Sequence, residues 1–123
     1  MPLDVLIVDD SAAIRKILER VLRHADFGLR DVVEASDGKE GLARLAEKEV
    51  DLVLSDINMP NMDGLEFLAQ MKADDRWKNL PVIMVTTEGS QAKVMQAIQL
   101  GASGYIRKPF TAEQIKEKLQ GIL

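Results

Sequence analysis

The sequence predicts an α/β fold in which five parallel strands alternate with five helices in a doubly wound sheet. Two observations lead to this prediction. Short apolar runs recur along the chain, and longer segments with the spacing of amphipathic helices separate them. A length of 123 residues and a hydrophobic fraction of 46% are ordinary for one compact domain. We therefore expect residues 1–123 to form a single domain.

The apolar runs are the predicted strands. The first, third and fourth are continuously apolar, which is typical of parallel strands buried on both faces. We expect the strands at Val5–Val8, Val32–Ala35, Leu52–Ser55, Val82–Val85 and Tyr105–Ile106.

The segments between the strands carry the signals of helices. One buried helix face, with i, i+3, i+4, i+7 spacing, is formed by Ile14, Ile17, Leu18, Val21 and Leu22. The same kind of spacing returns near the end of the chain at Ile115, Leu119 and Ile122. Three pairs have the spacing of a capping box, and we expect helices to begin there: Asp37 with Glu40, Asp63 with Glu66, and Thr111 with Gln114.

Composition excludes several classes of protein. The net charge of −4 gives no basic face for a nucleic-acid backbone. The chain has no cysteine, so disulfides and thiolate metal sites are excluded. No apolar run approaches the ~18 residues of a membrane span, and the first residues do not resemble a secretion signal. We expect a cytoplasmic protein that binds neither nucleic acid nor membrane.

Polar residues stand where the predicted strands end. Asp9 and Asp10 follow the first strand, Asp56 follows the third, Thr86 the fourth and Lys108 the fifth. Because ligands of doubly wound sheets bind beyond the carboxyl ends of the strands, we expect these side chains to converge at one edge.

The acidic residues at this edge predict a metal site. Three carboxylates in a partly desolvated cleft repel one another unless a cation neutralises them, and oxygen ligands suit a hard ion such as Mg²⁺. The sole histidine, His24, lies at the far end of the first helix, which disfavours zinc. The first turn reads Asp9-Asp10-Ser11 without glycines, so a nucleotide-phosphate loop is excluded. The alternative is that the two acids only stabilise the start of a helix capped by Ser11.

A carboxylate beside Mg²⁺ is a competent nucleophile for phosphorus. Asp56 is the candidate nucleophile, Lys108 can supply an ammonium group, and the Thr86 hydroxyl can donate to a phosphoryl oxygen. Each residue also has a simpler interpretation. Asp56 stands in a turn-rich stretch, Lys108 could be a solvated lysine, and Thr86 could be an ordinary β-branched strand residue.

Four segments occur along the chain in the order VLIVDDS, LVLSDINMPNMDGLEFL, LPVIMVTTEGS and GASGYIRKPF. In this order and spacing they resemble the receiver domain of two-component response regulators, especially single-domain chemotaxis regulators of the CheY kind. The resemblance spans essentially the whole chain and implies a flavodoxin-like (βα)5 fold with strand order 2-1-3-4-5 and no output domain.

The resemblance also implies roles for individual residues. It implies that Mg²⁺, or Mn²⁺, is held by Asp9, Asp10, Asp56 and the backbone carbonyl of Asn58. Lys108 and Thr86 would contact the phosphoryl group on Asp56. Tyr105 would change rotamer on activation, although a static edge aromatic is an equal alternative from the sequence.

Further implications concern kinetics and partners. Asn58 and Glu88 are the residue types of regulators whose phosphorylated form is short-lived, and the Lys108-Pro109 bond is expected to be cis. A sensor histidine kinase would be the phosphodonor, and a phosphatase is a further partner. A downstream target would dock on the face formed by helix four, strand five and helix five, which comprises residues 90–100, Tyr105 and residues 111–123.

The expected function is a stand-alone, monomeric phosphorylation switch in chemotaxis or motility signalling, not an enzyme acting on external substrates. Three alternatives remain open. One is a Mg²⁺-dependent phosphohydrolase with an aspartyl intermediate, but the haloacid-dehalogenase type has a second acid where this chain has Asn58. Another is a phosphorelay shuttle outside chemotaxis. The third is a flavodoxin-like electron carrier, although the chain lacks the Ser/Thr-rich loop of that class after its first strand.

Overall fold

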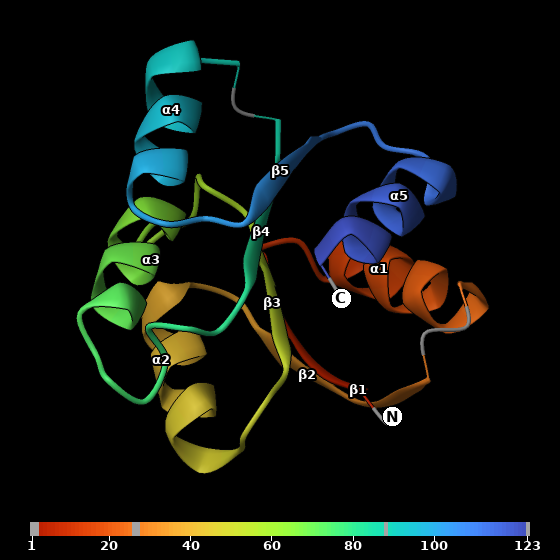
Figure 1. Ribbon diagram of the computed structural model, residues 1–123, viewed down its shortest axis with the longest axis horizontal. Helices are drawn as coiled ribbons and strands as arrows, with labels where there is room; N and C mark the ends of the chain where they lie inside the picture. The colour runs from red at the N-terminus through yellow and green to blue at the C-terminus, as the bar shows by residue number, and fades with distance from the viewer. Residues whose placement is uncertain (1–2, 26–27, 88, 123) are drawn as a thin grey trace.

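The computed structural model describes residues 3–25, 28–87 and 89–122 and shows five strands that alternate with five helices (Figure 1). The strands are β1 (Leu3–Val8), β2 (Leu29–Ala35), β3 (Leu52–Ser55), β4 (Val82–Thr86) and β5 (Gly104–Arg107). The helices are α1 (Ala12–His24), α2 (Gly38–Glu47), α3 (Gly64–Lys72), α4 (Gln91–Gln99) and α5 (Ala112–Ile122). Every predicted strand is present.

The strands form one parallel sheet in the order β2-β1-β3-β4-β5, which confirms the predicted flavodoxin-like topology. Helices α2, α3 and α4 cover one face of the sheet, and α1 and α5 cover the other (Figure 1). The strand order reverses between β1 and β3. In such sheets the crevice for ligands lies at this reversal, beyond the carboxyl ends of the two strands.

Alternate residues of the central strands pack into two separate hydrophobic clusters. Leu6 and Val8 of β1 belong to the cluster that contains Phe67 of α3, whereas Val5 and Ile7 belong to the cluster beneath α1 and α5. All four β1 residues are at most 1% exposed. Burial on both faces explains why the strand is continuously apolar.

Strand β1 begins at Leu3, two residues before the predicted start at Val5, and it therefore includes the charged residue Asp4. Asp4 is only 3% exposed, and its carboxylate is paired with the Arg30 guanidinium, whose Nε donates at 3.0 Å. The backbone N–H of Asp31 donates to the same carboxylate at 3.1 Å. Aspartate is disfavoured in strands, and these partners on β2 make it acceptable here.

Four of the five helices described begin at the predicted capping residues; the fifth, α4, begins after Ser90, which was not predicted as a cap. The side chains of Ser11, Asp37 and Asp63 each accept a hydrogen bond from a backbone N–H of the first turn. Thr111 and Gln114 form the full reciprocal capping box, at 3.1 and 2.9 Å. In α2 the Glu40 carboxylate instead accepts a hydrogen bond from Ser36 Oγ at 2.9 Å. Among the helices described, none has the length and apolar character needed to cross a membrane.

Candidate functional site

Asp9, Asp10 and Asp56 converge at the carboxyl ends of the two central strands. Asp9 directly follows β1 and Asp56 directly follows β3, and these strands are hydrogen-bonded neighbours. Carboxylate oxygens of the three residues lie within 4.8 Å of one another. Asp9 is 1% exposed and Asp56 6%, whereas Asp10 is exposed. The sheet therefore brings together the three acids that the sequence indicated.

Lys108 joins the acidic cluster from the end of β5. Its Nζ donates to Asp9 Oδ2 at 2.7 Å and to Asp56 Oδ2 at 3.1 Å. Its backbone N–H donates to the Thr86 carbonyl at 2.9 Å, and the Lys108-Pro109 bond is cis as expected. The lysine side chain is only 11% exposed, so the interpretation as a solvated lysine is wrong.

The pKa values of this pair reflect competition between burial and pairing. Burial raises the pKa of Asp9, and the hydrogen bonds from Lys108 and from the Ser11 N–H offset only part of that effect. Burial lowers the pKa of Lys108, but its hydrogen bond to Asp9 and the charge of Asp56 outweigh this and raise the pKa overall. The balance differs because Lys108 interacts with two carboxylates, whereas Asp9 interacts with one ammonium group and with the like charge of Asp56. Lys108 is thus a permanent cation at neutral pH.

Asp56 is held by the start of the following helix. Its Oδ1 accepts the backbone N–H of Ile57 at 2.7 Å, and the Ile57 carbonyl accepts the N–H of Gly64 at 2.7 Å. A Cβ on Gly64 would lie 1.9 Å from the Asp56 carbonyl oxygen. The sequence indicated only that this stretch is turn-rich, and it did not predict the contact between Gly64 and Asp56. The available signal was a glycine directly after the capping residue Asp63, where a helix former is usual.

The remaining predicted residues occupy the same edge or its surroundings. Thr86 is the fully buried last residue of β4, next to Lys108. Tyr105, in the edge strand β5, is half-buried and packs against the cluster beneath α2, α3 and α4. Asn58 is exposed in the loop between β3 and α3, and Glu88 lies outside the described residues.

The cluster fits a hard divalent cation. Its donors are all carboxylate oxygens, which suit such an ion. In the described part of the chain, the ion pairs of these three carboxylates involve only the ammonium group of Lys108, so negative charge is in excess. Asp9 Oδ1 also accepts the N–H of Ser11 at 2.9 Å, so contact with the start of α1 helps to hold the carboxylate in place. The two interpretations of Asp9, helix contact and metal ligand, are therefore compatible.

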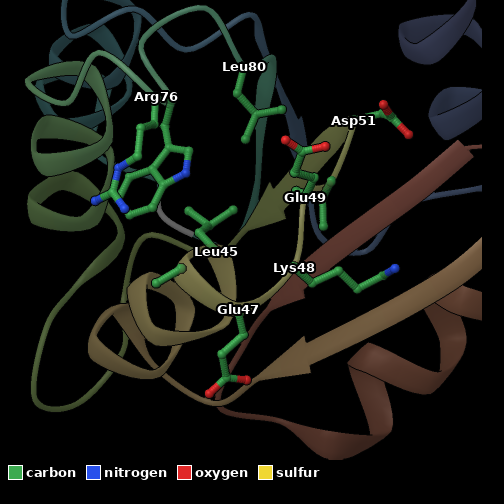
Figure 2. A pocket seen from close by; sticks show the side chains of 10 residues that line it. Leu45, Glu47, Lys48, Glu49, Asp51, Arg76 and Leu80 are labelled. Carbon is green, nitrogen blue, oxygen red and sulfur yellow. The ribbon is translucent and has the colours of Figure 1, made fainter.

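A separate pocket of about 410 Å³ lies at the opposite side of the molecule, near the amino ends of β3 and β4 (Figure 2). Leu45, Glu47, Glu49 and Leu80 are among its lining residues, which belong to the end of α2 and to the connections that lead into β3 and β4. None of the predicted site residues lines it. This pocket therefore does not form part of the acidic site.

Comparison with known proteins places these features in a family. The family model described as the response regulator receiver domain matches residues 5–120. The chemotaxis protein CheY of Pseudomonas aeruginosa is 42% identical over 96% of this chain and 94% of its own length. The solved structure of the chemotaxis response regulator CheY4 of Vibrio cholerae covers 100% of both chains, with a TM-score of 0.88 and 36% identity.

A third similar structure is the complex of CheX, CheY, BeF₃ and Mg²⁺ from Borrelia burgdorferi. It has a TM-score of 0.87 and 31% identity, and the match covers 98% of this chain and 88% of that one. Sequence, fold and the position of the acidic cluster all agree, and the chain belongs to the family of response-regulator receiver domains.

Proposed function

We propose that this receiver accepts a phosphoryl group on Asp56 from a phosphohistidine of a sensor kinase, and that the modification changes its affinity for a separate partner protein. The similarity to CheY proteins supports a role in chemotaxis signalling. The observation that carries the proposal is the joint position of three carboxylates and Lys108 at the reversal of strand order.

The residues suit transfer of a phosphoryl group to a carboxylate. A carboxylate oxygen of Asp56 forms the new bond to phosphorus while the bond from phosphorus to the histidine nitrogen breaks, and the nitrogen keeps the electron pair. Lys108, already 3.1 Å from Asp56, neutralises charge on the phosphoryl oxygens. Thr86 supplies a hydroxyl at the same edge. The domain thus contributes to its own phosphorylation and dephosphorylation, with no external substrate.

Mg²⁺ would be held by Asp9, Asp10, Asp56 and the backbone carbonyl of Asn58. When bound, the ion supplies positive charge for the equatorial oxygens of the transferring group. The Mg²⁺ in the Borrelia complex supports a divalent cation as the ligand of this site. Asn58 is exposed two residues after Asp56, and this position supports a role in setting the rate of dephosphorylation.

Incubation with acetyl phosphate tests the phosphorylation site. The wild-type protein should gain one phosphoryl group by mass spectrometry in the presence of Mg²⁺ and none after chelation with EDTA. Asp56→Asn should gain none under either condition, because the nucleophile is absent. Equal labelling of the Asp56→Asn variant, or Mg²⁺-independent labelling of the wild type, contradicts the proposal.

The proposed partner surface is the face formed by α4, β5 and α5. Strand β5 is at the edge of the sheet, with α4 and α5 on either side of it (Figure 1). A groove of about 440 Å³ in this region is lined by residues that include Tyr105, Gln114 and Lys118. On α4, Met95 is 50% exposed and Ile98 44% exposed. Exposed apolar side chains on this face favour a protein partner.

Tyr105→Ala tests the route from the phosphorylated site to this surface. We expect phosphorylation to increase target affinity in the wild type and to have a much smaller effect in the variant, because Tyr105 lies between the core and the groove. Target binding by the phosphorylated and unmodified forms can be compared by calorimetry. An unchanged affinity ratio in Tyr105→Ala shows that the signal takes another route.

A further inference from the structure

The loop between β3 and α3, residues 57–63, is hydrogen-bonded to the start of α2. The side-chain amide of Asn61 donates to Asp37 Oδ2 at 2.7 Å, and the backbone N–H of Gly38 donates to the Met62 carbonyl at 3.0 Å. A Cβ on Gly38 would lie 2.9 Å from that carbonyl oxygen. The two loops are therefore in direct backbone contact, with one side-chain bond added.

Asn61 has an unusual backbone conformation. Its φ is 65°, and it is the only non-glycine residue with a positive φ among the described residues. The left-handed region is less unfavourable for asparagine than for most residues, but it still costs free energy. Two hydrogen bonds help to offset this cost: the bond from Asn61 to Asp37, and the bond from the Met62 N–H to the Pro60 carbonyl at 2.7 Å, which closes the turn around Asn61.

Asp37 uses both carboxylate oxygens. Oδ1 accepts the N–H of Glu40 at 2.8 Å and caps α2, while Oδ2 accepts from Asn61. The residue is 9% exposed. The hydrogen bonds from the Glu40 N–H and from Asn61 lower the pKa of Asp37, so both oxygens remain acceptors at neutral pH.

The position of this contact relates it to the acidic site. Strand β1 lies between β2 and β3, so a bond from the β2–α2 connection to the β3–α3 loop spans the sheet edge where β1 ends in Asp9. The attached loop carries Asn58, three residues before Asn61. Its other end is closed by the bond from Gly64 to Ile57.

We propose that Asp37 is a positioning residue for the metal site, and that its bond to Asn61 holds the 57–63 loop in the conformation that presents the Asn58 carbonyl to the ion. This inference rests on the proposed function. It predicts that breaking the bond weakens Mg²⁺ binding even when the fold is retained.

Asn61→Gly breaks the bond without changing charge, and glycine tolerates the positive φ. We expect a dissociation constant for Mg²⁺ about tenfold higher than that of the wild type, the size of effect typical of groups that orient metal ligands. The constant is measured from Mg²⁺-dependent amide shifts in NMR spectra, without any phosphorylation. Asn79→Gly is the matched control, because it makes the same uncharged substitution in an exposed turn at the opposite ends of the strands.

A second pair of variants tests the bond by exchanging its donor and acceptor. Asn61→Asp places a second carboxylate against Asp37 and removes the donor of the bond, so Mg²⁺ binding should weaken. In Asp37→Asn/Asn61→Asp the new amide can donate to the new carboxylate, and binding should return to nearly the wild-type constant. Each titration is repeated in about 0.5 M NaCl. At this concentration the Debye length is about 4 Å, and screening by salt weakens the electrostatic effect of the carboxylate introduced at position 61.

The outcomes separate this inference from the proposed function. Absence of Mg²⁺ binding by the wild type contradicts the proposed function itself. If the wild type binds Mg²⁺ and Asn61→Gly lowers the urea midpoint without changing the dissociation constant, the bond is merely structural and the inference is wrong. Failure of the double variant to recover affinity in high salt also overturns it.

Discussion

Two aspartates of the first strand region, Asp4 and Asp9, are both largely inaccessible to solvent but differ in electrostatics. Arg30 and Lys48 surround Asp4 at one edge of the sheet, and its pKa falls to about 2. At the other edge, burial raises the pKa of Asp9 despite its bond to Lys108. A buried carboxylate whose ion pairs outweigh the cost of burial stabilises the fold. A buried carboxylate whose partners offset only part of that cost is typical of a functional site.

The lowered pKa of Asp4 predicts a pH dependence of stability. Because its pKa is about 2 in the folded state and about 3.9 in an unfolded chain, its stabilisation is complete above about pH 4 and is lost as the pH falls through about 2. Asp4→Asn should therefore be less stable at pH 7 and should lose less stability between pH 4 and pH 2. Urea unfolding at several pH values measures this, and parallel profiles for the two proteins would rule it out.

At the scale of elements, the junction between β3 and α3 is the most constrained connection of the site. The first residue of α3, Gly64, touches the backbone of Asp56, and the capping residue Asp63 begins the helix immediately before it. The position of the nucleophile relative to the helix is thus set by the absence of one side chain. The turn-rich sequence did not predict this contact, because the contact depends on how the loop folds back and places Gly64 against Asp56.

Gly64→Ala should reverse the usual effect of alanine in a helix. Alanine is normally favoured over glycine in helices by about 1 kcal/mol, but here its Cβ would meet the Asp56 carbonyl oxygen at 1.9 Å. We expect a loss of unfolding free energy of about 2 kcal/mol or more, together with slower labelling by acetyl phosphate.

Gly121→Ala in α5 is the matched control for this prediction, because an added Cβ there meets nothing within 4 Å. This control should be at least as stable as the wild type in urea unfolding. If Gly64→Ala behaves like Gly121→Ala, the contact with Asp56 does not constrain the junction.

At the scale of the molecule, the two hydrophobic clusters stabilise the sheet from both faces, and the acidic site lies at its edge between the central strands. A ligand at this edge joins β1 and β3, which are formed by distant parts of the chain. A cation bound there therefore stabilises the folded state and has no equivalent site in the unfolded chain.

Mg²⁺ should consequently raise the stability of the whole domain. At a free concentration 100 times the dissociation constant, the gain is about 2.7 kcal/mol. Asp10→Asn should abolish most of this gain while changing the stability without Mg²⁺ very little, because Asp10 is exposed. Urea unfolding with Mg²⁺ and with EDTA gives both quantities. An equal gain in the wild type and in Asp10→Asn would exclude Asp10 as a ligand.

Much of this description could be predicted from local sequence. The apolar runs identified every strand, and the capping pair of Thr111 and Gln114 marked the start of α5 as the structure shows it. The strand ends were less well predicted, because Asp4 is tolerated in β1 only through Arg30 on the neighbouring strand. That Lys108 contacts both Asp9 and Asp56 was expected only in outline, since the bonds join residues 99 and 52 positions apart.

The sequence by itself determined the alternation of strands and helices, and with it the edge at which the polar residues gather, because side-chain periodicity and capping are local properties of the chain. The tertiary structure alone decided the close contact of Gly64 with Asp56 and the bond between Asp37 and Asn61. It also decided the balance of burial and pairing that raises the pKa of Asp9. These features depend on atoms from separate elements meeting at particular distances, and no local pattern specifies such distances.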